Sequence, residues 1–368
     1  MISAAHSATD IARDRTRARL VLLLFLLTAG FFVAITLSPL RSGFADAPDR
    51  GPGDVELYEA EAKRVHAGQS YYDAAAAELT QRGYPTRSIF NWRTPLPVWL
   101  VGKLPQLAAA NVILGLAGLA LALLSFRLLV EEGTVNQAIT VVLLLAGAVL
   151  PCLLGPLVLV SELWSGVLLA MSAVLFGIKR PCAGVAAGIG ALVFRELAAP
   201  YCLLCVALAA YERRYRELAL WGIGLAAYAV YFGLHVAQVL PRIGPEAIAH
   251  QAGWIRLGGA GFVISTAQMN AYLLLLPQWV TAIYLACALL GAATWNTPAG
   301  RLIAFAVAGY LVAFGIAGHD FNQYWGSEIA PLVCLPAARS PAVLRQLWRE
   351  ATAVPTGGAQ PRALIKSV

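Results

Sequence analysis

The sequence predicts an all-α, polytopic membrane protein of about ten transmembrane helices, with an amphipathic helical loop on the outer side. Of its 368 residues, 59% are hydrophobic and only 13% are charged. Soluble domains carry roughly 25% charged residues, so a soluble fold of this length would leave much of its surface without charge. The apolar residues also form long runs, such as 20–39 and 136–160, and about 20 apolar residues are enough for one span.

The first apolar run follows a cluster of arginines, namely Arg13, Arg15, Arg17 and Arg19. A secretory signal begins in the same way, but its apolar region has only about 7–15 residues, and the run here is longer. The cleavage-like Ala-Asp-Ala at 45–47 also lies well beyond the end of the run. We therefore expect a retained first helix, preceded by a cytoplasmic tail over 1–19.

Nine further spans are expected from the apolar runs at 106–130, 135–154, 162–178, 182–198, 200–211, 217–240, 270–295, 301–317 and 326–338. A shorter apolar piece, 95–104, is expected to form a helix at the outer surface. Together these elements make up one membrane domain over 20–338, which includes a first outer loop at 41–94.

Ten spans place both termini in the cytoplasm. The short basic clusters, such as Lys179-Arg180 and Arg213-Arg214, then fall on the cytoplasmic side, as the positive-inside rule requires. The polar loops 41–94, 241–267 and 318–324 fall outside. The segment 339–368 is basic and contains Pro and Gly throughout, which predicts a cytoplasmic tail without fixed structure.

Composition and motifs argue against several classes of protein. The net charge of +7 comes from clusters beside apolar runs, without basic stripes interleaved with aromatics, so we expect no nucleic-acid partner. No phosphate-binding glycine loop precedes a helix. The six cysteines lie in or beside apolar runs, so no external disulfide framework is expected. The Cys202-x-x-Cys205 pair is interpreted as buried packing, with a redox or metal site as the alternative.

The first outer loop contains the densest polar chemistry. After Gly51-Pro52-Gly53, Asp54 opens a helix in which apolar side chains recur at helical spacing at Val55, Tyr58, Ala62 and Val65. Charged residues occupy the opposite face, which is typical of a helix that rests on a bilayer surface. A second helix is expected over 74–81, with Asp73 as its N-cap and Gly83 at its end.

This loop resembles the first outer loop of GT-C class membrane glycosyltransferases, most closely the polyprenol-phosphate-mannose-dependent family 87. The resemblance covers about fifty residues and rests on Asp54, Tyr58, Gly68, Tyr71, Tyr72, Asp73 and Pro95. The remaining spans are similar in layout only. One departure is that the loop ends in Phe-Asn-Trp-Arg-Thr-Pro at 90–95, where the family often has Tyr-Pro-Pro.

The resemblance implies a membrane glycosyltransferase, and through the donor of family 87 a mannosyltransferase, which takes a sugar from a polyprenyl-phosphate carrier. The acceptor is a lipid or glycan, and the site faces the extracytoplasmic side of the plasma (inner) membrane. In the family a carboxylate of this loop takes the proton of the acceptor hydroxyl, and the matching residue here is Asp54. The alternative for Asp54 is a helix N-cap and nothing more.

Other polar residues near the outer face complete the predicted site. Arg195 and Glu196 interrupt an apolar run, and ionisable groups within spans are usually functional. We expect Arg195 and His319 to bind the donor phosphate, although Arg195 could instead form a structural ion pair. Residues expected to contact the sugar or acceptor are Glu56, Tyr58, Tyr72, Glu196, Asn322, Tyr324 and Trp325. Glu162 is a second candidate carboxylate, and His250 and Arg256 are candidates to line the site.

The sequence contains no spacing typical of metal ligands, so no metal site and no firm cofactor are predicted. A divalent cation between Asp54 and another carboxylate remains an open alternative. Two other functions also remain open. A secondary transporter would need internal repeats and broken helices at mid-membrane. A non-catalytic envelope-assembly protein would keep the helices without needing Asp54.

Overall fold

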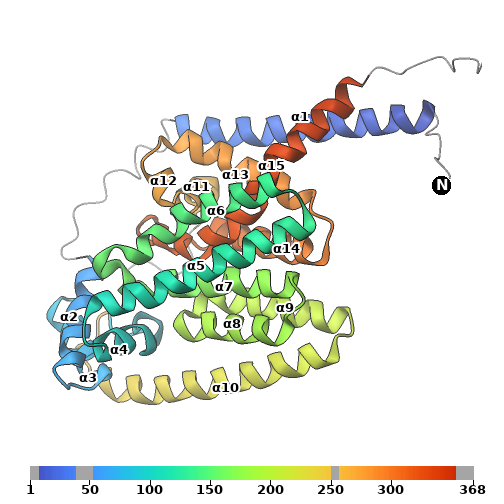
Figure 1. The fold of residues 1–368 in the computed structure, drawn as a ribbon. Coiled ribbons are helices and arrows are strands. Elements are labelled where there is room, and N and C mark those ends of the chain that lie inside the picture. Colours follow the sequence, from blue (N-terminus) through green and yellow to red (C-terminus); the bar gives the residue numbers. More distant parts are fainter. Residues whose placement is uncertain (1–7, 39–52, 250–256, 354–368) are drawn as a thin grey trace, which may run out of the picture.

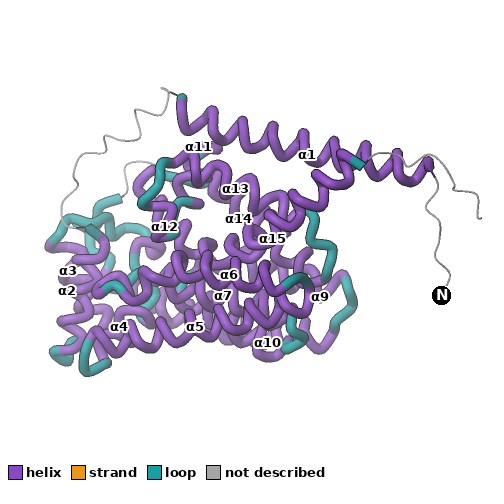
Figure 2. The backbone as a smooth tube through the Cα atoms, turned by 45° about the horizontal axis from the view of Figure 1, so that its top comes forward, coloured by secondary structure: helices purple, strands orange, loops and turns teal. Residues whose placement is uncertain are grey.

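The computed structural model describes residues 8–38, 53–249 and 257–353. Within these ranges the protein consists of helices joined by turns and loops, without a strand, as Figure 2 shows. The all-α prediction is therefore confirmed for the described part of the chain.

The first half of this part contains α1 (Ala8–Leu37), α2 (Asp54–His66), α3 (Tyr71–Gln81), η2 (Ile89–Asn91), α4 (Leu96–Lys103), α5 (Leu107–Glu132), α6 (Val135–Val149), η3 (Leu150–Leu153), η4 (Gly155–Leu159) and α7 (Ser161–Gly177). The second half contains α8 (Pro181–Phe194), η5 (Glu196–Ala198), α9 (Ala199–Tyr211), α10 (Tyr215–Val239), η6 (Leu240–Arg242), α11 (Gly259–Ala267), α12 (Ala271–Leu274), α13 (Gln278–Ala293), α14 (Pro298–Ile316), η7 (Asp320–Trp325) and α15 (Gly326–Thr352). The η elements are 3₁₀ turns. Each predicted span coincides with helix over most of its length, but the fifth (182–198) is interrupted at Arg195 and the eighth is divided into α12 and α13.

Five helical segments are long and apolar enough to cross a membrane, judged by length and composition within the described chain. They are Asp14–Leu37, Leu107–Glu132, Val135–Leu153, Tyr215–Arg242 and Pro298–Ile316. Four shorter apolar helices accompany them, at Ser161–Gly177, Pro181–Phe194, Glu196–Tyr211 and Gln278–Ala293. Exposed leucines on α1 and α5 fit a surface that faces lipid. A polytopic helical membrane protein thus accounts for the fold, and the count of ten spans stays a prediction.

The helices form one packed body, with the short helices α2, α3 and α4 gathered at one end (Figure 1). The helix α1 lies along one edge and α10 along the opposite edge, with the other long helices between them. At the end where α10 finishes, α2, α3 and α4 pack together and cover the long helices. The helices α2 and α3 of this cap belong to the predicted first outer loop, and α4 is the predicted short helix after it, so the polar residues of the loop meet the same end of the helical body.

The cap helices begin slightly differently from their predicted starts. Gly53, and not Asp54, is the N-cap of α2. Ser70, and not Asp73, is the N-cap of α3, and its hydroxyl accepts a hydrogen bond from the Asp73 backbone N–H. The predicted end of α3 is confirmed, because Gly83 adopts φ +69° just after the helix. An N-cap role therefore does not explain Asp54.

Close packing of the long helices depends on glycines. A Cβ atom at Gly291 of α13 would lie 1.9 Å from the Pro336 carbonyl oxygen of α15. A Cβ atom at Gly166 of α7 would lie 2.4 Å from the Ser327 carbonyl oxygen. Small residues let helix backbones approach in this way where the hydrophobic effect cannot drive association. The helix α15 is thus held at the centre by α7 and α13.

The predicted unstructured tail is wrong for its first part, because α15 continues to Thr352. Three prolines, Pro331, Pro336 and Pro341, lie inside this helix. A proline cannot donate to the carbonyl four residues earlier, and for Pro341 that carbonyl belongs to Ala337. The Ser340 hydroxyl donates to it at 2.8 Å. A side chain thus satisfies the freed carbonyl, and contacts with α1 hold the last turns. Residues 354–368 lie outside the described residues.

Candidate functional site: a buried arginine–glutamate–tyrosine cluster

Arg93 is the centre of a polar cluster under the cap helices. Its Nε donates to the Tyr58 hydroxyl at 2.9 Å, and its Nη2 donates to the Tyr324 hydroxyl at 2.9 Å. Its Nη1 lies 3.9 Å from Glu196 Oε1, which is too far for a hydrogen bond. The guanidinium therefore joins α2, η7 and the break between α8 and α9.

The backbone around Arg93 is held on several sides. The Tyr71 hydroxyl donates to the Arg93 carbonyl at 2.7 Å. The Trp92 indole N–H donates to the Thr86 carbonyl at 3.0 Å, and the Thr94 hydroxyl to the Val193 carbonyl at 3.4 Å. The segment between η2 and α4 is thus fixed to the end of α8. Arg93 was not among the predicted site residues; the only signal was an arginine just before the Thr-Pro that returns the chain to the apolar runs.

Arg195 lies in a break between two helices. The predicted fifth helix, 182–198, ends earlier, because α8 stops at Phe194 and Arg195 adopts an extended conformation with φ −152° and ψ 124°. Pro200 in the first turn of α9 restarts the helix. The Tyr310 hydroxyl donates to the Leu197 carbonyl at 2.8 Å and so stabilises the break. The break lets Arg195 turn into the interior instead of continuing along a helix face.

Two carboxylates surround Arg195. Its Nε lies 2.8 Å from Glu162 Oε1, and its Nη1 donates to Glu196 Oε1 at 2.5 Å. The side chains of Arg195 and Glu162 are 3% and 1% exposed, whereas that of Glu196 is 28% exposed. An unpaired buried charge is costly, and this arrangement pairs each of the buried ones. The predicted neighbours Arg195 and Glu196 are therefore in contact, and Glu162 belongs with them.

Asp54 lies beside this cluster on the first turn of α2. Its Oδ1 accepts a hydrogen bond from the Tyr84 hydroxyl at 3.1 Å. Burial raises the pKa of Tyr58; the Arg93 charge lowers it, and the charges of Asp54 and Glu162 raise it further. The charges of Arg93, Asp54 and Glu162 therefore all act on one buried hydroxyl. Asp54 and Tyr58 stand four residues apart, which places both on one face of α2.

Glu61 continues that face and is buried without a partner for one of its oxygens. The residue is 2% exposed, and its Oε2 has no hydrogen-bond partner within the described residues. Burial raises the pKa of Glu61 to about 8, helped by the nearby Glu78 and opposed by Arg93 and Arg82. Glu78 differs, because Arg64 and Arg82 bind it at 2.5 and 3.0 Å. Sequence reasoning missed Glu61, which lies between apolar positions of the helix.

Tyr72 belongs to a neighbouring cluster. Its hydroxyl lies 3.3 Å from His235 Nδ1 on α10, and the Arg242 guanidinium lies 5.6 Å from the centre of its ring. Arg242 also donates to Asp73 at 2.8 Å. These contacts join α3 to the end of α10. They favour a role for Tyr72 in fixing the cap, next to the arginine cluster.

The predicted residues of the last outer loop divide between the cluster and the core. Tyr324 binds Arg93, as described. The Trp325 ring packs against Phe262 and Phe314, with centroid distances of 6.5 and 6.2 Å, which favours packing over sugar stacking. His319 and Asn322 are buried, and the His319 ring stacks on Phe321 at 5.1 Å. The η7 turn thus brings one predicted residue directly into the cluster.

Three further expectations concern the edges of the site. Glu56 is exposed, two residues from Tyr58 and so on the other side of α2. His250 and Arg256 lie outside the described residues. Within the described ranges, no group of three His, Cys, Asp or Glu side chains is placed to hold a metal ion. Cys202 and Cys205 are free thiols buried on α9, as the packing interpretation expects.

Comparisons of the chain with protein-family models, with curated proteins and with solved structures found no match.

Proposed function

We propose that the protein is a ten-span membrane glycosyltransferase with a GT-C-like fold. It would transfer a sugar from a polyprenyl-phosphate carrier to a lipid or glycan acceptor on the outer face of the plasma membrane. The observation that carries the proposal is the position of Asp54 beside the buried cluster of Arg93, Arg195, Glu162 and Glu196. Ionisable groups buried among apolar helices are expensive and mark functional sites.

Asp54 is the proposed general base. Glycosyl transfer needs a group that removes the proton of the acceptor hydroxyl as this oxygen attacks the sugar. The Asp54 carboxylate is partly exposed and held in one orientation by the Tyr84 hydroxyl. It can therefore meet an acceptor from the polar end of the molecule while the buried cluster lies behind it.

Arg93 is the proposed phosphate-binding residue, in place of Arg195. The charge that grows on the leaving phosphate must be stabilised by a cation. Two carboxylates already neutralise Arg195, and its side chain is 3% exposed. Arg93 is 18% exposed and donates to two neutral hydroxyls, and its Nη1 lies 3.9 Å from Glu196, beyond hydrogen-bond distance, so this nitrogen could donate to an anion. Arg195 would instead orient Glu196 beside Arg93.

Substitution of Asp54 tests the proposal. The purified Asp54→Asn variant is assayed for transfer from polyprenyl-phosphate sugars, with polyprenyl-phosphate mannose as the first donor, to membrane-lipid acceptors. Loss of a general base should lower kcat by about 10²-fold or more. Glu56→Gln is the matched control, because it removes an exposed carboxylate from the same helix turn. A wild-type rate of sugar transfer in Asp54→Asn would exclude Asp54 as the general base. If the wild-type protein transferred no sugar from these donors, the proposed glycosyltransferase function would be contradicted.

A secondary transporter is the second candidate, favoured by the helix breaks. The chain breaks at Arg195 between α8 and α9 and again between α12 and α13. Transporters often bind substrates at such discontinuous helices. Uptake into proteoliposomes that is abolished by Arg195→Gln and unaffected by Asp54→Asn would favour transport. Sugar transfer that depends on Asp54 would favour the enzyme.

A further inference from the structure

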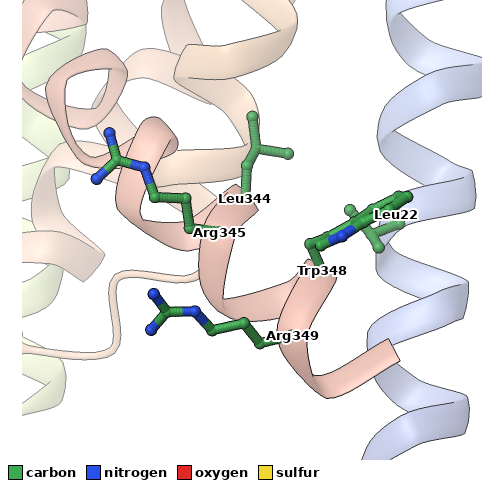
Figure 3. Close-up of a pocket in the computed structure, with 5 residues that line it drawn as sticks. All are labelled: Leu22, Leu344, Arg345, Trp348 and Arg349. Atoms are coloured by element: carbon green, nitrogen blue, oxygen red, sulfur yellow. The ribbon is translucent and has the colours of Figure 1, made fainter. Parts of the chain in front are cut away.

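The described residues leave an open hollow between α1 and the last turns of α15, away from the polar cluster. Leu22, Leu344, Arg345, Trp348 and Arg349 line it. Figure 3 shows Trp348 directed towards Leu22 of α1, while the two arginines extend from the other side of α15. The hollow is therefore lined by apolar side chains next to α1 and by two arginines whose guanidinium groups extend away from Leu22.

The two arginines have no acidic partner. Both are exposed, and within the described residues neither forms an ion pair. The nearest carboxylate in sequence, Glu350, accepts a hydrogen bond from Gln346 at 2.8 Å instead. Arg345 and Arg349 stand four residues apart on a helix, where like charges repel each other. An anion between them would remove this repulsion.

The apolar side of the hollow is suited to a hydrocarbon chain. Trp348 is 65% exposed, and Leu22 and Leu344 are partly exposed. Tryptophan is enriched where the hydrocarbon of a bilayer meets water. A ligand that places a negative group on the arginines and an apolar chain along Leu22 matches the chemistry of the surface.

The position of the hollow along the helices fits the membrane boundary. A rise of about 1.5 Å per residue puts Arg345 roughly 28 Å from the start of α15 at Gly326. The hydrocarbon core of a bilayer is about 30 Å thick. The Arg19 Nε donates to the Ala351 carbonyl at 3.2 Å, so the basic end of α1 lies at the same level. Both helices thus bring arginines to one interface, at the end opposite the cap helices (Figure 1).

We propose that this hollow binds an anionic glycerophospholipid, with its phosphate between Arg345 and Arg349 and an acyl chain along Leu22 and Leu344. The lipid would bridge α1 to α15. The helix α1 otherwise meets only the edge of the helical body, chiefly at α13 and α15, so a bridging lipid would stabilise its attachment. The site is separate from the proposed transferase cluster, and its occupancy does not depend on sugar transfer.

The test compares lipids on the purified, delipidated full-length chain. Bound lipid is counted by native mass spectrometry, and the unfolding temperature is recorded with phosphatidylglycerol, phosphatidylcholine or inorganic phosphate. We expect the wild type to retain phosphatidylglycerol in preference to phosphatidylcholine and to unfold at a higher temperature with it. In Arg345→Gln/Arg349→Gln, binding of phosphatidylglycerol should weaken roughly 30-fold.

Arg213→Gln/Arg216→Gln is the matched control. It removes one exposed arginine from the turn between α9 and α10 and another from the first turn of α10, and binding should remain as in the wild type. If the control lost as much phosphatidylglycerol binding as Arg345→Gln/Arg349→Gln, the lipid would be held by general charge attraction, and the proposal would be overturned. So would equal binding of the two lipids, or equal stabilisation by inorganic phosphate. If the double variant does not fold, Trp348→Ala takes its place and should bind less phosphatidylglycerol than the wild type, and unchanged binding would overturn the proposal.

Discussion

Arg93 and Arg195 carry the same charge, but their surroundings assign them different roles. Arg195 lies between two carboxylates in the break after α8, where it balances buried charge. Arg93 donates hydrogen bonds to two tyrosine hydroxyls, and its third nitrogen faces Glu196. A negative ligand would have to compete with Glu162 and Glu196 for Arg195, whereas the hydrogen-bond partners of Arg93 are neutral hydroxyls and Glu196 lies 3.9 Å from it.

Replacement of Arg93 should therefore impair turnover more than folding. In Arg93→Lys the charge stays, but a lysine cannot donate to Tyr58 and Tyr324 in the same planar geometry. We expect kcat for sugar transfer to fall by about tenfold or more while the unfolding temperature changes little. Arg87→Lys, an exposed arginine of the same loop, is the control and should behave as the wild type. Equal kcat in both variants would remove Arg93 from the site.

Glu61 should make the stability of the protein depend on pH. Its pKa is raised to about 8 in the folded protein, so the folded state holds a proton that the unfolded chain releases near pH 4.5. Stability therefore falls as the pH rises between these two values and levels off above the higher one. In Glu61→Gln, the loss of unfolding temperature between pH 5 and about 9 should be smaller than in the wild type. The control, Glu59→Gln, removes a carboxylate paired with Lys63 at the surface, and should keep the wild-type dependence. An unchanged profile in Glu61→Gln would show that Glu61 is ionised when folded.

The sequence predicts a site residue only where the residues next to it in the chain make it stand out. Asp54 follows a glycine-rich turn, and Arg195 interrupts an apolar run, so both are visible in the sequence. Arg93 is visible only through its contacts with Tyr324, which is 231 positions away in the chain. Glu61 resembles a solvated helix residue until the packing of α2 is known.

At the scale of elements, apolar runs predicted the helices well and their breaks poorly. A run of apolar residues identifies a helix because its backbone groups must be satisfied within the segment. The same run does not show that α8 ends at Phe194, because the break depends on Tyr310 and on the carboxylates around Arg195. The length of α15 was also missed, since contacts with α1 and the Ser340 hydroxyl compensate for its prolines.

The contact between α13 and α15 can be tested with a single methyl group. In Gly291→Ala the new Cβ atom meets a backbone oxygen at 1.9 Å, which rotation of a side chain cannot relieve. Overpacking of this kind costs about 1–3 kcal/mol or more, and we expect a clearly lower unfolding temperature. Gly309→Ala on α14 is the control, because a Cβ atom there meets nothing within 4 Å, and alanine favours helix. Similar unfolding temperatures in both variants would mean that the two helices are not so close.

For the whole molecule, the ten-span arrangement makes a prediction about sidedness. The turn between α2 and α3 follows the first span and should lie outside, and the turn between α9 and α10 follows the sixth and should lie inside. In a cysteine-free background, Ala67→Cys should react with an impermeant maleimide on intact cells. Arg213→Cys should react only after the membrane is opened. Both positions are exposed, so a reaction of both from the same side would contradict the ten-span count.

The buried pair of Glu162 and Arg195 also has a consequence for biogenesis. A charge opposes partition of its segment from the translocon into lipid, by about 2.5–3.5 kcal/mol at a helix centre and by less at the helix ends where Glu162 and Arg195 lie, and α7 and α8 are short. Together the two charges neutralise each other at 2.8 Å. We therefore expect α7 and α8 to enter the bilayer as one hairpin during synthesis. In a glycosylation-mapping assay, Glu162→Leu should reduce insertion of the α8 segment, and normal insertion in that variant would show that each helix partitions alone.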